Sequence, residues 1–287
     1  YIQHMVDNIK SMINNVVEFP NRLLKDVDIL SEDEEKLLSD FCKGEDADVD
    51  EDLLISGYFR RHALENPDAI AVDDGVNQVS YGELEKSSNS IANDLSENYG
   101  ISLDSHVALI LPRNYHYPEL TLALNKLGAA FIPIDTIYPL KRIEHMLEIS
   151  EAQCIVTTKD IAGKFDFDLD IICIEDLNYD DDVEVEIVAT SKNLFSIMFT
   201  SGTTGLPKGV KITRKSILNF IDFHVNDLDI IRGDVYGLFA SIGFDVAMAA
   251  IFSAMYAGGY VNVIPEDIRL NIKALNNHFV KYGVTHS

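Results

Sequence analysis

The chain has 287 residues, and its 23 Lys or Arg against 47 Asp or Glu give a formal net charge of −24 at pH 7. This charge argues against the clustered positive surface with which proteins bind nucleic acids or anionic membranes, so neither partner is expected. Hydrophobic residues make up 47% and charged residues 24% of the chain, a composition typical of a globular protein.

The first 52 residues predict two helices and a linker. Apolar residues recur at helical spacing through residues 1–24. Ser31 and Glu34 have the spacing of a capping box, which predicts that a second helix starts there. Six acidic residues among the eight from 45 to 52 then indicate a solvated linker, and we place a domain boundary in it.

From residue 53 onward, short apolar strands alternate with amphipathic helices. A hairpin is expected around Asp73-Asp74-Gly75, and a second capping box, Ser80 to Glu83, predicts the next helix. The pattern predicts an α/β fold with a mostly parallel sheet covered on both faces. Helices are expected at 53–66, 80–97, 118–127, 139–149 and 247–256, and strands at 70–72, 78–80, 106–111, 130–134, 153–157, 171–174, 194–199, 210–212 and 260–264.

One uncharged stretch, residues 246–265, has the length of a membrane-spanning helix. Gly258, Gly259 and Pro265 interrupt it, and Asp245 at its start would be costly in lipid. We therefore expect a buried helix followed by a buried strand.

Three cysteines, Cys42, Cys154 and Cys173, lie far apart in the sequence, and the histidines show no metal-ligand spacing. No disulfide scaffold and no metal site are predicted, and a reducing cytoplasm is the expected location. The chain begins at Tyr1 without a basic segment before an apolar core, so no signal peptide is expected. Because it ends at Ser287 just as an apolar run begins, we expect it to be a fragment of a longer protein.

The segment with most chemical information is residues 200–209, which read TSGTTGLPKG between two predicted strands. Three glycines would let the backbone expose its N–H groups, four hydroxyls add donors, and Lys208, Lys211, Arg214 and Lys215 place positive charge nearby. Such a set suits a polyphosphate. The spacing is neither that of a Walker loop nor GxGxxG, and an ordinary hydroxyl-rich hairpin loop is the alternative.

This segment resembles the phosphate-binding signature of the adenylate-forming enzymes, which include acyl-CoA ligases, luciferases and the adenylation domains of nonribosomal peptide synthetases. Residues 79–84 (VSYGEL) and 124–135 (LNKLGAAFIPID) resemble further blocks of that superfamily, in the same order. The continuation from Tyr138-Pro139 to Arg142-Ile143 is typical of peptide-synthetase adenylation domains. The resemblance implies the N-terminal part of the adenylate-forming fold, incomplete here and preceded by a short helical segment.

A further block, Phe244-Asp245-Val246, is similar to the family's Phe-Asp-x-Ser, with Ala247 in place of Ser. In the family this Asp pairs with the α-ammonium group of an amino acid, and by the same alignment Val246 and Ala249 line the side-chain pocket. Without the resemblance, Asp245 would be read as a helix N-cap, and Val246 and Ala249 as ordinary helix-packing residues.

The start of the chain resembles the tail of a condensation domain. The resemblance therefore implies three parts: that tail at residues 1–30, an acidic linker at 31–52, and the first part of an adenylation core at 53–287.

The resemblance implies a parent enzyme that uses ATP and Mg²⁺ to convert an α-amino acid into aminoacyl-AMP and pyrophosphate. The acyl group would then pass to the phosphopantetheine thiol of a downstream carrier-protein domain. An acyl- or aryl-CoA ligase, or a non-catalytic nucleotide-binding or interaction fragment, are the alternatives. We expect no complete catalytic set and no aminoacyl-AMP formation by residues 1–287 alone, and the amino acid is not identified by the sequence. The predicted phosphate-binding residues are Thr200, Ser201, Gly202, Thr203, Thr204, Gly205 and Lys208, and the predicted substrate-binding residues are Phe244, Asp245, Val246 and Ala249.

Overall fold

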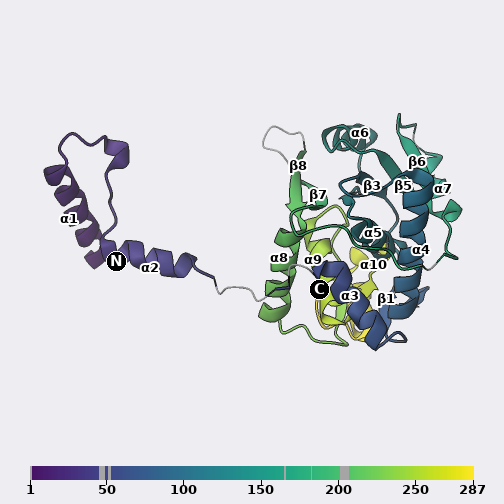
Figure 1. The fold of residues 1–287 in the computed structure, drawn as a ribbon. Coiled ribbons are helices and arrows are strands. Elements are labelled where there is room, and N and C mark those ends of the chain that lie inside the picture. The colour runs from purple at the N-terminus through teal and green to yellow at the C-terminus, as the bar shows by residue number, and fades with distance from the viewer. Residues whose placement is uncertain (1, 45–48, 51–52, 165, 182, 201–206) are drawn as a thin grey trace. The chain divides into compact units, whose positions relative to one another are not determined.

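The computed structural model describes residues 2–44, 49–50, 53–164, 166–181, 183–200 and 207–287 (Figure 1). The chain divides into two units, an N-terminal unit, Tyr1–Asp48, and a core unit, Val49–Ser287. The division falls within the acidic segment 45–52, where the sequence predicts a domain boundary.

The N-terminal unit consists of helices with little buried surface. Helix α1 (Ile2–Glu18) ends before Pro20 and is followed by a 3₁₀ turn, η1 (Leu24–Asp26), and by α2 (Glu32–Cys42). The capping box at the start of α2 is confirmed, because Ser31 Oγ accepts from Glu34 N at 3.3 Å and Glu34 Oε2 accepts from Ser31 N at 3.1 Å. Among the described residues of α1 and α2 none is buried.

The core unit contains two sheets and the helices that cover them. Its helices are α3 (Leu54–Glu65), α4 (Tyr81–Tyr99), α5 (His116–Leu127), α6 (Leu140–Ile149), α7 (Lys159–Ala162), α8 (Arg214–Asp227), α9 (Asp245–Ala257), α10 (Glu266–Arg269) and α11 (Ile272–Tyr282), with a 3₁₀ turn, η2 (Ile174–Asp176). Its strands are β1 (Ile70–Asp73), β2 (Gln78–Ser80), β3 (His106–Ile110), β4 (Ala130–Pro133), β5 (Cys154–Thr157), β6 (Asp170–Cys173), β7 (Leu194–Thr200), β8 (Lys208–Thr213), β9 (Val235–Leu238) and β10 (Tyr260–Val263).

The larger sheet has the strand order β6-β5-β3-β4-β7-β8, and the smaller one has the order β2-β1-β10-β9. Within each sheet all neighbouring strands are parallel except one antiparallel pair at an edge, β7 with β8 and β1 with β2. The α/β class and the mostly parallel strands are confirmed, and the strands divide between two sheets.

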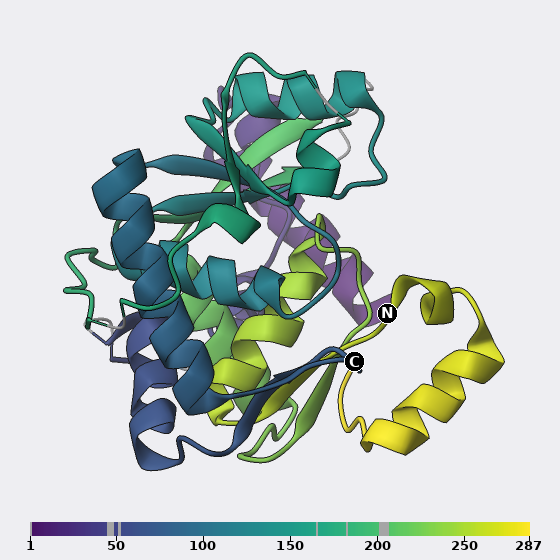
Figure 2. The same cartoon turned by 90° about the vertical axis from the view of Figure 1, so that its right-hand side faces the viewer.

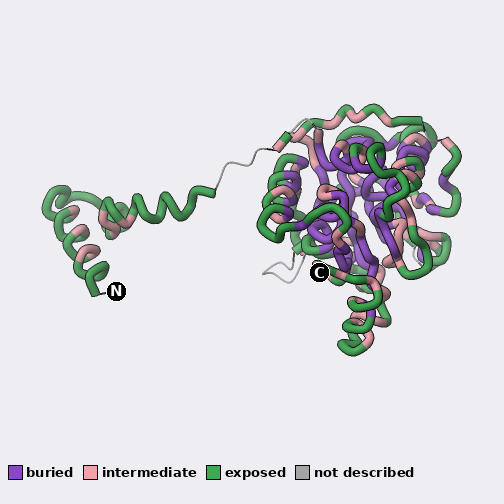
Figure 3. Tube along the Cα trace, turned by 90° about the horizontal axis from the view of Figure 1, so that it is seen from below, coloured by how far each residue is buried: buried purple, intermediate pink, exposed green. Residues whose placement is uncertain are grey.

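Alternation along the strands separates two apolar clusters on the two faces of the six-stranded sheet. Val107 and Leu109 of β3 belong to one cluster, whereas Ala108 and Ile110 belong to the other, which also includes residues of α6. Both faces are therefore buried, as Figure 3 shows by the concentration of buried residues in the centre of the core unit. This two-sided burial explains why the strands are apolar without interruption.

Helix α9 contains the uncharged segment, residues 247–256, that the sequence predicts to be a buried helix, and it packs against both sheets. The ring of Phe252 lies 4.9 Å from that of Phe195 in β7 and 6.3 Å from that of Phe131 in β4, measured between centroids. Helix α9 also contacts β9 and β10. A helix enclosed in this way is apolar on all sides. Throughout the described residues, no helix combines the length and apolarity needed to cross a membrane.

The smaller sheet has a helix beside it near the end of the chain. Figure 2 shows α10 and α11 standing to one side of the two sheets. His278 of α11 contacts β10 through a 2.7 Å hydrogen bond between its Nε2 and Asn262 Oδ1. Residues 285–286 bond to β9, with Thr285 N donating to Val235 O at 2.9 Å.

Candidate functional site

The two ends of the glycine-rich segment face each other across the β7–β8 hairpin. Thr200, the last residue of β7, is the register partner of Lys208, the first residue of β8, and both are exposed. The predicted phosphate-binding residues Ser201, Gly202, Thr203, Thr204 and Gly205 lie outside the described residues. Because β7 runs parallel to β4, the hairpin follows the carboxyl edge of the sheet, where open α/β sheets bind their ligands.

The four cations near this hairpin have different surroundings. Lys208 and Lys211 are exposed but separated by three positions on a strand, so they point to opposite faces of the sheet. Arg214 is 2% exposed and donates to the backbone oxygens of Asn125 and Ala129 and to Asn125 Oδ1. Burial lowers the pKa of the Arg214 guanidinium to about 10.

The positive charge that the sequence places near this segment is therefore divided, because Arg214 points into the protein while Lys208 and Lys211 lie on opposite faces of β8. Arg214 instead binds the carboxyl-terminal end of α5 and the turn into β4, where backbone oxygens lack helical partners. Lys208 lies on the same face of β8 as Ile212, which packs against the larger apolar cluster. Among the described residues near the hairpin, Lys208 therefore places its charge on the face of the sheet that carries the larger apolar cluster.

The second part of the predicted site is the start of α9. The N-cap position is occupied by Phe244, which makes no side-chain cap hydrogen bond, and Asp245 is the first helical residue. The Asp245 carboxylate accepts from the adjacent Val246 N at 2.9 Å. Asp245 is therefore not the N-cap that the alternative interpretation assumes, although a carboxylate in the first turn is still favoured by the helix dipole. Phe244, Asp245 and Val246 are exposed, and Ala249 is buried.

A cavity of about 560 Å³ lies between α8 and α9 and brings three of the four predicted substrate-binding residues together. Asp245, Val246 and Ala249 line it from α9, and Phe244 is not among its lining residues. The remaining walls are Ile212 of β8, Ser216, Ile217, Phe220 and His224 of α8, Met248 of α9, and Leu228, Tyr236 and Ser287. Its lining is mainly apolar, and Asp245 supplies the one carboxylate side chain among the lining residues.

Sequence reasoning missed the α8 wall of this cavity. His224 lies there with its Nδ1 2.9 Å from Ser253 Oγ and its Nε2 3.4 Å from the Tyr236 hydroxyl, and burial lowers its pKa. The helix could have been found, because Thr213 accepts from Ser216 N at 3.2 Å as an N-cap and apolar residues follow at helical spacing. In the sequence, Arg214 and Lys215 of its first turn indicated only positive charge near the glycine-rich segment.

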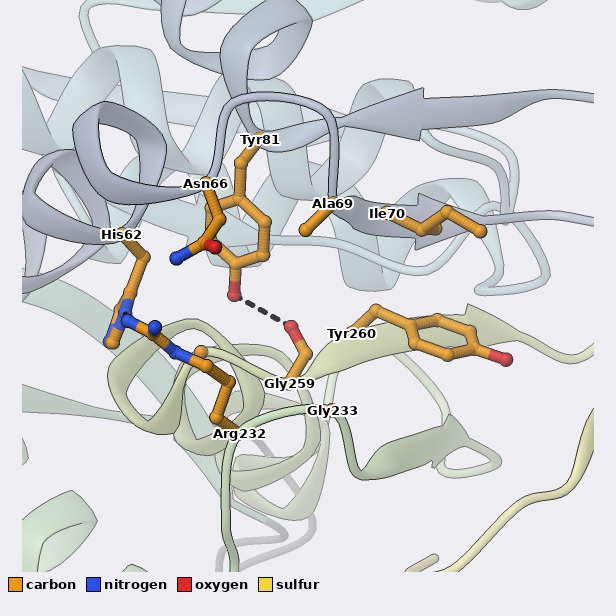
Figure 4. Close-up of a pocket in the computed structure, with 10 residues that line it drawn as sticks. His62, Asn66, Ala69, Ile70, Tyr81, Arg232, Gly233, Gly259 and Tyr260 are labelled. Carbon is orange, nitrogen blue, oxygen red and sulfur yellow. Dashed lines mark hydrogen bonds between the residues drawn. The ribbon is translucent and has the colours of Figure 1, made fainter.

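A second cavity, of about 280 Å³, lies where α3 and α4 meet the turn between α9 and β10 (Figure 4). Three polar side chains that line it, those of His62, Tyr81 and Arg232, bond to other groups of the protein. Tyr81 donates its hydroxyl hydrogen to Gly259 O at 2.6 Å, and Arg232 pairs with Glu65 and with His62 Nδ1. His62 Nε2 lies 2.9 Å from Tyr256 O, and burial lowers the pKa of His62. This cluster fixes the carboxyl-terminal end of α9 and leaves its hydrogen-bonding groups engaged.

Within the described ranges, no group of three or more His, Cys, Asp or Glu side chains is arranged to hold a metal ion.

Comparison with known proteins assigns the chain to a family. Residues 59–287 match the family described as AMP-binding enzyme, and the chain belongs to that family. Among its relatives, surfactin synthase subunit 1 of Bacillus subtilis (strain 168) is 30% identical over 282 residues, which cover 96% of this chain and 8% of that protein. Gramicidin S synthase 2 of Brevibacillus brevis is 30% identical over 278 residues, covering 96% and 6%. The chain thus spans less than a tenth of the length of these two relatives.

Solved structures share the fold. A four domain nonribosomal peptide synthetase bound to AMP and glycine superposes with a TM-score of 0.81 at 22% identity, covering 98% of this chain and 21% of that one. The N-terminal subdomain of Klebsiella oxytoca NpsA, in complex with 3-hydroxyanthranilyl-AMSN, gives a TM-score of 0.72 at 22% identity, covering 81% and 58%. The predicted resemblance to adenylate-forming enzymes and the predicted fold class are confirmed.

Proposed function

We propose that this chain is part of a nonribosomal peptide synthetase and that it binds ATP and an α-amino acid for conversion into aminoacyl-AMP and pyrophosphate. The observation that supports this proposal most directly is the placement of Asp245 with Val246 and Ala249 at one cavity. A carboxylate at an apolar cavity suits a ligand that carries one positive charge beside an apolar group. The α-ammonium group of an amino acid supplies that charge.

Strand β8 connects this cavity with the proposed phosphate site. Lys208 and Ile212 lie on one face of the strand, about 13 Å apart at 3.3 Å per residue. Ile212 lines the cavity, and Lys208 stands at the hairpin tip. An amino acid in the cavity and the phosphates of ATP at the hairpin would therefore lie on the same side of the six-stranded sheet.

In the proposed reaction, a carboxylate oxygen of the amino acid bonds to the α-phosphorus of ATP while the bond from that phosphorus to the bridging oxygen breaks and pyrophosphate leaves. Thr200, Ser201, Gly202, Thr203, Thr204, Gly205 and Lys208 would bind the phosphates. Mg²⁺, when bound, would neutralise phosphate charge. Asp245 would hold the ammonium end, so that the residues of this chain contribute orientation and charge pairing.

The wider assignment follows the relatives. We place the tail of a condensation domain at residues 1–30, a linker at 31–52 and the first part of an adenylation core at 53–287. The acyl group would then pass to a phosphopantetheine thiol on a carrier-protein domain of the longer protein, which we place in the cytoplasm. The support is the extent of the similarity, which covers 96% of this chain in peptide synthetases such as surfactin synthase subunit 1.

Amino-acid-dependent exchange of labelled pyrophosphate into ATP by the full-length enzyme tests the proposal. Asp245 is exposed in the chain without substrate, so its pairing with the ammonium group should be worth a charge-assisted hydrogen bond, about 1.5–3 kcal/mol, and Asp245→Ala should lower exchange roughly 10- to 100-fold. Lys208→Ala should weaken ATP use by about 1–3 kcal/mol, as for one charge-assisted hydrogen bond. Asp267→Ala, in α10, and Lys211→Ala, on the opposite face of β8, are the matched controls.

Three results would contradict the proposal. If Asp245→Ala kept its exchange activity and lost only thermal stability, the carboxylate would serve the helix and not the substrate. Exchange that depends on acids without an amino group would identify an acyl- or aryl-CoA ligase instead. The absence of any exchange by the full-length protein would favour a non-catalytic nucleotide-binding or interaction role.

A further inference from the structure

The segment that leads into Asp245 is a turn organised by Ser241. Phe244 N donates to Ser241 O at 3.0 Å, and Gly243 N donates to Ser241 Oγ at 3.3 Å. Ser241 thus binds the turn through both its backbone and its side chain. Because Asp245 follows this turn directly, the position of its carboxylate depends on where Ser241 is held.

Ser241, which follows β9 of the smaller sheet, is held by a residue that follows a strand of the six-stranded sheet. Its hydroxyl donates to Asp135 Oδ2, and Asp135 follows β4 of the six-stranded sheet. Asp135 is 9% exposed, and its second oxygen, Oδ1, accepts from Ile137 N at 3.2 Å. One carboxylate oxygen therefore fixes the side chain to its own loop while the other binds the turn before α9.

Tyr138, from the same loop as Asp135, packs against the turn. A methyl group at Gly243 would lie 2.6 Å from the Tyr138 hydroxyl oxygen, so the ring occupies the space that any larger residue would need. The Arg142 guanidinium carbon lies 4.0 Å from the centre of the Tyr138 ring. The loop after β4 thus contacts the turn through a hydrogen bond at Ser241 and a close approach at Gly243.

The backbone just before the turn is fixed from a third segment. Arg113, which follows β3, donates to the backbone oxygens of Leu238 and Ala240, and to Ile264 O at 3.3 Å. Burial lowers the pKa of the Arg113 guanidinium to about 10. Arg113 holds the backbone just before the turn and Asp135 holds Ser241 at its start, so the turn has little freedom to move Asp245.

The location of Asp135 gives these contacts a functional meaning. Strand β4 pairs with β7, and β7 ends at Thr200, where the proposed phosphate-binding segment begins. Asp135 therefore stands at the carboxyl edge of the strand next to β7 and bonds to the turn that carries Asp245. The same edge of the sheet thus holds Thr200, the first of the proposed phosphate-binding residues, and, through Asp135, positions the ammonium-binding carboxylate.

We propose that Asp135 and Ser241 are positioning residues, which set the place of the Asp245 carboxylate and so the orientation of the bound amino acid. This inference rests on the proposed function of Asp245. Neither residue needs to contact the substrate, because Ser241 acts on Asp245 through the turn and Asp135 acts through Ser241. The expected signature is a defect in amino acid binding that does not extend to ATP.

Pyrophosphate exchange by the full-length enzyme, with KM measured separately for the amino acid and for ATP, tests this role. Ser241→Ala removes a single oxygen atom and should raise KM for the amino acid about tenfold, the effect of losing one hydrogen bond to a charged group. KM for ATP should stay unchanged, whereas the thermal midpoint should fall only by the effect of one lost hydrogen bond, because Asp135 Oδ2 loses its donor. Ser241→Thr keeps the hydroxyl and should restore KM for the amino acid, and Ser87→Ala in α4 is the matched control.

Asp135→Ala combined with Ser241→Ala should show that the two residues act as one unit. The double variant is expected to have the same KM for the amino acid as Asp135→Ala alone. An unchanged KM for the amino acid in Ser241→Ala, or an equal rise in both KM values with a lower thermal midpoint, would overturn the positioning role. If the unaltered enzyme showed no amino-acid-dependent exchange, the proposed function itself would fail, and this inference would fail with it.

Discussion

Arg214 offers a direct way to separate structural from phosphate-binding cations. Its guanidinium donates to three acceptors, the backbone oxygens of Asn125 and Ala129 and the side-chain oxygen of Asn125. Replacing it by Met fills most of the space but leaves these acceptors without their donor. We expect Arg214→Met to destabilise the core unit and to leave ATP binding intact.

The magnitude follows from two opposing contributions. Each buried acceptor that loses its donor costs about 1–3 kcal/mol. Removing the guanidinium also removes the cost of burying its charge, a cost that the lowered pKa of Arg214 reflects. The net loss in the free energy of unfolding should be about 3 kcal/mol. For a unit of the size of Val49–Ser287, this corresponds to a fall of about 6–12 °C in the thermal midpoint.

Thermal unfolding of the 287-residue chain, followed by circular dichroism, measures the predicted loss. Lys211→Met, on exposed β8, is the matched control and should leave the midpoint unchanged. In the full-length enzyme, KM for ATP should be unchanged in Arg214→Met and raised in Lys208→Ala. If Arg214→Met had a normal midpoint and a raised KM for ATP, Arg214 would belong to the phosphate site and our interpretation of its contacts would be wrong.

Two further predictions concern the stability of the core unit. Lys126 Nζ lies 2.9 Å from Glu85 Oε2, and burial lowers the pKa of Lys126 to about 8. Glu85→Ala should therefore lower the free energy of unfolding, measured with urea, by about 3–5 kcal/mol, and adding Lys126→Met should recover most of that loss. Equal losses in the single and double variants would contradict the pairing. Burial also lowers the pKa of His62 and of His278, so below about pH 6.5 the unfolded chain binds protons that the folded chain does not. The urea concentration at the unfolding midpoint should decrease when the pH is lowered from 7.5 to 5.5, and it should decrease less in His62→Gln. An equal decrease in both proteins would show that His62 does not contribute.

Local sequence signals predicted many elements of this fold. The capping boxes at Ser31 and Ser80 form as expected, because each depends on residues only three positions apart. The apolar strands β3 to β5 were found for a similar reason, since burial on both faces leaves an uninterrupted apolar run. The division into two sheets was not predicted, because strand order depends on contacts between distant segments.

The site was predictable to the extent that its motifs are contiguous. The block from Phe244 to Val246 pointed to the start of α9, and the structure places Asp245 and Val246 at a cavity there. The opposite wall of that cavity, which includes His224, was missed because nothing in its local sequence marks it as a binding surface. The inward direction of Arg214 could not be foreseen either, since its partners lie 85–89 positions earlier in the chain.

The three carbonyl groups bound by Arg113 have a consequence for how the core unit unfolds. Arg113 follows a strand of one sheet, and its acceptors lie at the ends of β9 and β10 of the other. Separating the sheets would expose a buried cation and leave backbone acceptors unpaired, so partial opening of one sheet alone carries a high free energy. The backbone amides of β3 and those of β9 and β10 are therefore expected to exchange their hydrogens with solvent through the same cooperative opening, despite lying more than a hundred residues apart in sequence.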